Sequence, residues 1–179
     1  MTNTGDNMGK TCTAFLGAAL LALSSASSHA DDMAWQSVKS DACGGFTVKL
    51  PGKPREESAS EKDVILRTYA VERPEGLFTV ACVVYLPGAK VNIENELVTN
   101  RDNFNRESDA ALVSEAKISL QGVSGVDFTS ESVKNATNYR ARIYADGNRV
   151  YMLSAGVKKG QDQLVTIERF LGSFRLTDR

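Results

Sequence analysis

The sequence is almost without histidine, and the single one, His29, lies in its first thirty residues. Those residues have the composition of a secretory signal: a basic start at Lys10, an apolar run over 11–23 and small residues over 24–30 that end in a Ser-x-Ala pattern. We therefore expect cleavage near Ala30, which leaves a chain with no histidine. The apolar run is shorter than the roughly 20 residues that span a bilayer. We expect no stable membrane insertion after cleavage, and a protein that is periplasmic or secreted.

The lack of histidine excludes several classes of enzyme. Histidine is the usual general base and the commonest metal ligand near neutral pH. Without it the chain cannot form a Ser-His-Asp or Cys-His nucleophile system, a histidine-containing zinc, copper or iron site, or a histidine-ligated haem. Carboxylate chemistry, a Ser-Lys pair and oxygen-ligated calcium remain open. We expect no cofactor and no metal, and the balance favours a protein that is not an enzyme.

The sequence also lacks an excess of charge of either sign. Its formal net charge is −1, and removal of the signal takes away one base and one acid, Lys10 and Asp6. Such a chain has no overall field that attracts DNA or an anionic membrane, so we expect no nucleic-acid partner. The length after cleavage suits one domain with a sizeable core. We expect a polar N-terminal arm over 31–45 and a single domain over 46–179.

Cysteine is scarce as well. Cys12 lies in the signal, and only Cys43 and Cys82 remain. An even number of cysteines in an oxidising compartment favours a disulfide between them. The alternative is two unpaired thiols, since Cys82 lies in the apolar run VACVV and could be buried as a small hydrophobic residue. No C-x-x-C spacing is present to support redox catalysis.

Alternating apolar and polar residues predict most of the strands. The segment 46–50 (FTVKL) alternates and is followed by Pro51-Gly52-Lys53-Pro54, which cannot continue a strand. Asp146-Gly147 is a usual tight-hairpin dipeptide and predicts a hairpin between the strands on either side of it. The further predicted strands cover 64–72, 77–86, 115–120, 126–132, 138–145 and 149–157.

Two segments have helical spacing instead. Ile93, Leu97 and Phe104 recur along one side of the segment from Asn92 to Ser108, with Asn92 as the expected N-cap. The second helix is expected near the C-terminus, and its apolar side consists of Leu164, Ile167, Phe170 and Leu171, before Gly172 as a C-cap. The order of strands, helix, strands and helix predicts an α+β fold with a central antiparallel β-sheet flanked by helices.

Three segments carry a resemblance to a known family: GGFTVKLPGKPRE, YRARIYADGNRVYML and RFLGSFRL. They are similar to segments of a widespread group of exported, uncharacterised bacterial proteins that resemble the PsbP-type fold. PsbP is an extrinsic subunit of the photosynthetic oxygen-evolving complex. The resemblance spans most of the chain after the signal and implies an α/β/α sandwich that binds partner proteins without chemistry. Its motifs are structural, and no metal-ligand position of the photosystem subunit can be matched here.

Two features could supply catalytic groups. Ser114-Glu115-Ala116-Lys117 matches S-x-x-K, but it leads into a predicted strand and lacks the supporting S-D-N and K-T-G motifs, so a chance match is favoured. The acidic residues of the first helix region could form a carboxylate pair, although a solvated helix face explains them equally. These residues are Glu94, Glu96, Asp102, Glu107 and Asp109.

A cluster of arginine and tyrosine is the best candidate for a binding surface. The candidate residues are Arg140, Arg142, Tyr144, Arg149 and Tyr151. The first three share one face of their strand by alternation, and the last two lie across the hairpin turn. Arginine forks and tyrosine rings suit recognition of carboxylates, phosphates or a protein surface. The alternative is a set of cross-strand ion pairs with residues such as Glu131 or Asp127.

Taken together, these features predict an exported, non-enzymatic accessory protein that binds an envelope protein or a small anionic ligand. The alternative is a histidine-independent hydrolase that uses carboxylates or a Ser-Lys pair.

Overall fold

The computed structural model describes residues 34–61 and 64–177, which form two antiparallel sheets and two helices. The large sheet has seven strands in the order β3-β4-β5-β9-β8-β7-β6, and the small sheet has the order β1-β2-β10. The large sheet contains β3 (Arg55–Glu61), β4 (Val64–Arg73), β5 (Gly76–Tyr85), β6 (Ala111–Leu120), β7 (Val123–Ser132), β8 (Thr137–Asp146) and β9 (Arg149–Lys158). The small sheet contains β1 (Gln36–Ser40), β2 (Phe46–Leu50) and β10 (Arg175–Leu176).

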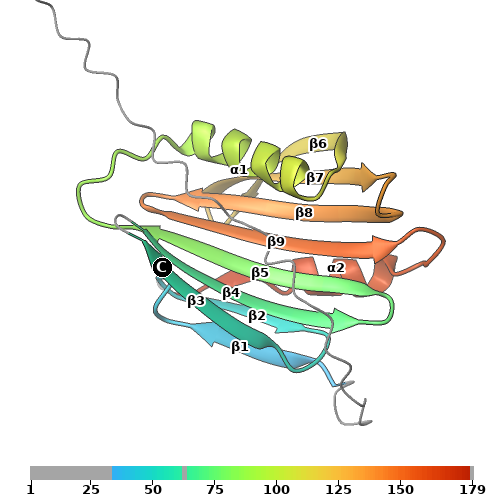
Figure 1. Ribbon diagram of the computed structural model, residues 1–179. Helices are drawn as coiled ribbons and strands as arrows, with labels where there is room; N and C mark the ends of the chain where they lie inside the picture. Colours follow the sequence, from blue (N-terminus) through green and yellow to red (C-terminus); the bar gives the residue numbers. More distant parts are fainter. Residues whose placement is uncertain (1–33, 62–63, 178–179) are drawn as a thin grey trace, which may run out of the picture.

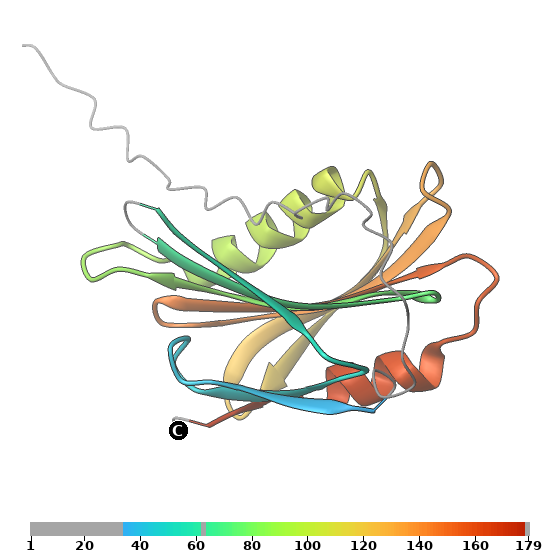
Figure 2. The ribbon, with the colours of Figure 1, turned by 60° about the horizontal axis from the view of Figure 1, so that its bottom comes forward.

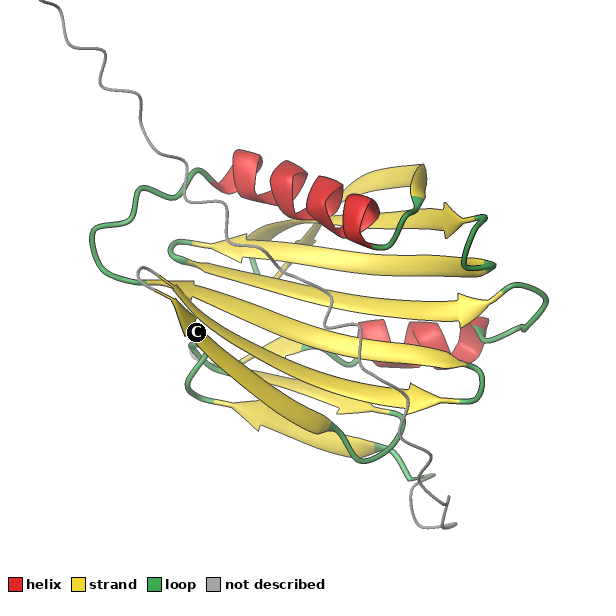
Figure 3. Cartoon of the chain, in the orientation of Figure 1, coloured by secondary structure: helices red, strands yellow, loops and turns green. Residues whose placement is uncertain are grey.

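The large sheet is the middle layer of the molecule. Helix α1 (Ile93–Glu107) lies on one face, and helix α2 (Leu164–Gly172) lies with the small sheet on the other (Figures 1 and 2). The chain is mostly strand, and the two helices lie on opposite sides of the large sheet (Figure 3). This arrangement is the predicted α+β sandwich, with a small second sheet added to the α2 layer. No helix in the described part of the chain is long and apolar enough to cross a membrane.

Helix α1 forms where the sequence predicts it. Asn92 is its N-cap, and the side-chain oxygen of Asn92 accepts a hydrogen bond from the backbone N–H of Asn95 at 3.0 Å. Ile93, Leu97 and Phe104 pack against a core of buried residues on the large sheet. The Phe104 ring meets the Phe128 ring edge-on at a centroid distance of 5.7 Å. The apolar stripe of the helix therefore decides which side faces the sheet.

The larger core lies between the two sheets. Phe46 from β2 meets Tyr151 from β9 at a centroid distance of 6.0 Å, and Phe174 lies against both rings. Phe170 of α2 packs edge-on against Phe78 of β5 at 5.8 Å. All of these rings are almost completely buried. The residues after α2 therefore join the small sheet and the large sheet into one core.

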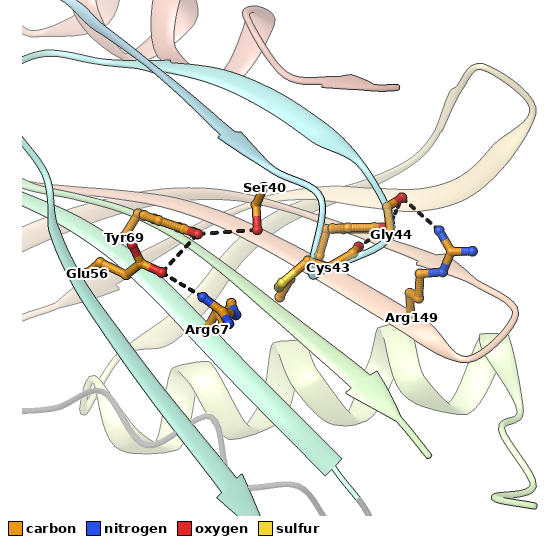
Figure 4. Close-up of a disulfide and its surroundings, with 9 residues drawn as sticks. Ser40, Cys43, Gly44, Glu56, Arg67, Tyr69 and Arg149 are labelled. Atoms are coloured by element: carbon orange, nitrogen blue, oxygen red, sulfur yellow. Dashed lines mark hydrogen bonds and ion pairs between the residues drawn. A yellow bond between two sulfur atoms is a disulfide. The ribbon is translucent and has the colours of Figure 1, made fainter. Parts of the chain in front are cut away.

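The disulfide expected from the cysteine count is present and links the two sheets. Cys43 lies in the turn between β1 and β2, Cys82 lies in β5, and their Cα atoms are 6.2 Å apart (Figure 4). Both residues are buried in the core between the sheets. Next to them, the Tyr69 hydroxyl oxygen lies within hydrogen-bonding distance of the side chains of Ser40 and Glu56, at 3.2 Å from each. The turn of the small sheet is therefore fixed to the large sheet by covalent and polar contacts.

The hairpin of β6 and β7 reaches the small sheet as well. The side chain of Gln121, in the turn of this hairpin, donates from Nε2 to the carbonyl of Leu176 at 3.0 Å. Its Oε1 accepts from the backbone N–H of Leu176 at 2.8 Å. Figure 2 shows this hairpin curving from the α1 side towards the C-terminus. The amide of Gln121 thus pairs with β10 as a backbone strand would.

Two strands were not predicted from the sequence. Segment 31–45 was expected to be a polar arm, but it contains β1, which pairs with β2 from Gln36 opposite Leu50 to Ser40 opposite Phe46. Trp35 lies beneath Arg169 of α2, whose guanidinium carbon is 4.3 Å from the ring centroid. Residues 35–40 therefore pack against the rest of the fold. The other unpredicted strand, β3, has no large apolar residue and lies at the edge of the large sheet. The expected signal over 1–30 lies outside the described residues.

Replacing both cysteines with alanine tests the role of the disulfide. The bond closes a loop with a sequence separation of 39, so we expect the double variant to lose about 2–4 kcal/mol of the free energy of unfolding. Urea denaturation followed by circular dichroism measures this loss, and the reduced wild-type protein is the control that should show a similar loss. An unchanged urea midpoint would contradict a stabilising role.

Candidate functional site

The five candidate residues of the β8–β9 hairpin all lie on the side of the large sheet that carries α2. In the β8–β9 pairing, Tyr144 is opposite Tyr151 and Asp146 is opposite Arg149. Because side chains alternate along a strand, Arg140 and Arg142 share the face of Tyr144. The structure therefore brings the five together on one face, of which the shared face of the three β8 residues was predicted, but it places them at different depths.

The two tyrosines belong to the core. Tyr144 is 4% exposed and Tyr151 is fully buried. The Tyr144 ring stacks on Phe174 at a centroid distance of 5.8 Å, and burial raises the pKa of its hydroxyl. The Tyr151 hydroxyl donates to the carbonyl of Cys43 at 2.9 Å. Their rings are occupied in packing the two sheets together, so they offer no surface to a partner.

Arg149 is held by the turn that carries the disulfide. Its Nη1 donates to the carbonyl oxygen of Gly44 at 2.7 Å (Figure 4). Gly44 has φ +69°, and a side chain added there would lie 2.0 Å from Nη1 of Arg149. Only glycine allows both this left-handed backbone and the close approach of the arginine. Arg149 therefore holds the turn between β1 and β2 through the carbonyl of Gly44.

The two remaining arginines form an ion-pair cluster with residues from β7 and α2. Arg140 donates from Nε to Asp127 at 3.2 Å, and Arg142 donates from Nε to the same carboxylate at 2.7 Å. Glu168 of α2 pairs with Arg140 and lies 3.8 Å from Arg142. These cross-strand pairs with Asp127 are the alternative interpretation weighed from the sequence. Glu131, the other acid considered there, pairs with Lys159 instead.

The ionisation of Asp127 reflects this cluster. Burial by itself raises the pKa of the carboxyl, but the hydrogen bonds and charges of Arg140 and Arg142 outweigh burial and hold the pKa below its ordinary value. The hydrogen bond to Asp127 likewise raises the pKa of Arg140. Asp127 and Arg140 thus stay charged together near neutral pH, and the ion pairs with Glu168 attach α2 to the sheet.

A pocket opens beside this cluster. It has a volume of about 240 Å³ and lies where β6–β9 meet α2. Arg140 is the one candidate residue that lines it. The apolar lining comes from Val113, Val157 and Ile167, and the polar lining includes Thr129 and Asn138. An apolar pocket with a few polar groups at its rim is the usual form of a binding site.

Uncovered apolar side chains border the pocket. Val113 is 64% exposed and lies at the register shift between Leu112 and Ser114. Leu164 is 57% exposed and precedes Glu168 by four residues, so both lie on the same side of α2. Apolar surface left open beside a pocket is characteristic of interaction sites.

The sequence could not show this pocket, because its walls come from separate segments. The register shift at Val113 has no sequence signature, and Ile167 was expected only as a core residue. The alternation that placed Arg140 on one strand face with Arg142 and Tyr144 was the one usable signal, and it identified one residue of the pocket lining.

The hydrolase alternative lacks geometric support in the described residues. Ser114 lies opposite Thr129 in the β6–β7 pairing and Lys117 lies opposite Val126, so the two side chains project from opposite faces of β6. A Ser-Lys nucleophile pair is therefore excluded at this motif. Of the acidic residues of α1, Glu96 accepts a hydrogen bond from the Tyr85 hydroxyl at 2.7 Å, and Asp102 forms an ion pair with Arg101. Residues 34–61 and 64–177 hold no group of three or more acidic or cysteine side chains that could bind a metal.

The fold defines the class to which this structure belongs, which is the PsbP-like α+β sandwich. The structure is similar to the solution structure of cyanobacterial PsbP (CyanoP) from Synechocystis sp. PCC 6803, with a TM-score of 0.56 and 10% sequence identity over 86% of this chain and 98% of the cyanobacterial chain. At this identity the likeness shows the fold alone.

Two weaker likenesses accompany it. One is to a protein of unknown function from Pseudomonas aeruginosa, with a TM-score of 0.39 and 10% identity over 70% of this chain and 83% of the other. The second is to a protein from Bacteroides thetaiotaomicron, with a TM-score of 0.35 and 15% identity over 74% of this chain and 45% of the other. No protein-family model matches the sequence, and no curated protein matches it.

Replacing Asp127 with asparagine tests the ion-pair cluster. Hydrogen bonds to charged groups contribute about 1.5–3 kcal/mol, so we expect the variant to lose roughly this much of the free energy of unfolding at pH 7. Because folding lowers the pKa of Asp127, its stabilisation is complete above the unfolded pKa of about 3.9 and is lost as the pH falls through the folded value. The difference between wild type and variant should therefore shrink below about pH 4.

Urea denaturation at a series of pH values measures both effects. The matched control is Asp41→Asn, since Asp41 is exposed and forms an ion pair with Lys39, which is exposed as well. That variant should stay within about 0.5 kcal/mol of wild type. A constant difference for Asp127→Asn down to pH 2 would show that the carboxylate charge contributes nothing.

Proposed function

We propose that this protein is an exported, non-enzymatic accessory domain that binds a partner protein of the cell envelope at the pocket beside α2. The observation that carries the proposal is the pocket itself, which is lined by Arg140 and the exposed Val113, while Leu164 is uncovered on the helix that contributes Ile167 to the lining. A protein segment that inserts one apolar side chain fits a hollow of this size.

The lining of the pocket favours a partner that inserts an apolar side chain and has polar groups around it. Arg140 is already neutralised by Asp127 and Glu168, so a free anion gains little by approaching it. Thr129 and Asn138 can instead exchange hydrogen bonds with a backbone. A small anionic ligand is therefore the less favoured occupant.

Export is supported by two independent features. The first thirty residues have signal-peptide composition, and the Cys43–Cys82 disulfide belongs to an oxidising compartment. The PsbP-like fold is compatible with an accessory role.

Export predicts a processed N-terminus. We expect the protein isolated from the envelope fraction of its host to begin at Asp31 and to contain the oxidised disulfide. Intact-mass measurement before and after reduction and alkylation checks both. An unprocessed chain found only in the cytoplasm would contradict export, whether or not the pocket binds a partner.

Site-specific cross-linking tests the pocket. A photo-reactive amino acid placed at position 164 should cross-link in cells to one partner protein, identified by mass spectrometry. The matched control is position 77: Leu77 is also exposed, but in β5 it alternates with Phe78, which faces the core between the sheets. It should give no such product.

Val113→Asp should then reduce that cross-linking at least about tenfold, because a charge in an apolar contact costs more than 1.4 kcal/mol. Circular dichroism checks that this variant folds. If position 164 gives no partner and native mass spectrometry finds a small anion bound, the ligand is not a protein. If neither is found, the pocket is not a binding site.

A further inference from the structure

Strand β6 forms one edge of the large sheet. It pairs with β7, and no other strand in the described part of the chain lies on its outer side. All residues from 111 to 117 are exposed, and Leu112 and Val113 are large apolar residues among them. A long, uncovered edge strand is a template for pairing with another strand.

The opposite edge of the sheet is different. Strand β3 has seven residues, four of which are charged: Arg55, Glu56, Glu57 and Glu61. Charged residues along an edge prevent strand pairing. The sheet therefore has one protected edge and one that is open to association.

The charges on β6 are arranged for pairing with a second copy. The strand has two charged residues, Glu115 and Lys117, which are separated by Ala116 and lie on the α1 face of the sheet. Glu115 pairs with Arg101 of α1. Lys117 is exposed and forms no ion pair with any residue that the structure describes.

In only one symmetric register does each charged residue of β6 lie opposite a residue of opposite charge. When two β6 strands pair antiparallel about Ala116, Glu115 of each copy lies opposite Lys117 of the other, so the contact is made twice. Shifting the centre to Glu115 or to Lys117 places like charges opposite each other, which is unfavourable. In the satisfied register Ala116 lies opposite itself, so no bulky side chain obstructs the centre.

We propose that β6 pairs with β6 of a second copy of this chain in that register, which gives a symmetric dimer with one continuous antiparallel sheet. A twofold contact of this kind closes on itself and uses the same surface of each copy. The exposure of Val98 agrees with a second copy at this edge. Val98 is 47% exposed and lies one turn before Arg101, on the side of α1 that reaches Glu115. The second copy would approach along this uncovered side. The proposal does not depend on the partner proposed for the pocket.

A charge-exchange experiment tests the dimer. Sedimentation equilibrium of the full chain should show a dimer for wild type. Lys117→Glu and Glu115→Lys should each raise the dissociation constant at least about tenfold, because each variant places two like-charge pairs in the interface. Mixing the two single variants restores opposite charges at both contacts and should restore the dimer. The double variant E115K/K117E should do so by itself.

The matched control is Glu57→Lys on β3, which makes the same charge reversal at the other edge and should leave the dimer intact. Thermal unfolding checks each variant, since Glu115→Lys also removes the ion pair with Arg101. Lys117→Glu breaks no ion pair among the described residues and keeps the test valid if that variant unfolds. A wild-type monomer up to about 1 mM, or a dimer that Lys117→Glu leaves unchanged, would overturn the proposal.

Discussion

The packing of Phe174 between the two sheets is the contact on which the α2 side of the molecule depends. Its ring stacks on Tyr144 and lies 5.5 Å from Phe46 and 5.6 Å from Tyr151, measured between centroids. Because the ring belongs to the segment between α2 and β10, it fixes the position of both elements. The disulfide from Cys43 adds a covalent link near the same core. The walls of the pocket keep their places because this core does not allow α2 to shift.

The arginines of β8 and β9 lie on one face of the sheet but have different structural roles. Arg149 fixes a turn of the small sheet, and Arg142 is used in the ion pairs that hold α2. Arg140 takes part in those pairs and also lines the pocket. These arginines share one face of the sheet, and their different contacts give them different roles. On α2 itself, Leu164 is left uncovered.

The sequence predicts the elements that bury apolar side chains. Strands β4, β5, β8 and β9 and helix α1 have clear apolar periodicity, and their expected and observed ranges agree within about two residues. Strand β3 was missed because an exposed edge strand needs no apolar alternation. Tyr144 and Tyr151 were predicted at a surface because a tyrosine has both a polar and an apolar part, and the sequence does not show which of the two is covered. The pocket depends on contacts among β6, β8 and α2 that no local pattern encodes.

The pairing of β10 with β2 has a consequence for how the protein folds. Leu176 lies opposite Phe46 in the small sheet, so β2, which already pairs with β1, gains its second neighbour only from residues 175–176. Contacts between residues so far apart in sequence form late and slow the search for the native topology. The core between the two sheets therefore stays incomplete until the segment that carries Phe174 and Leu176 has docked.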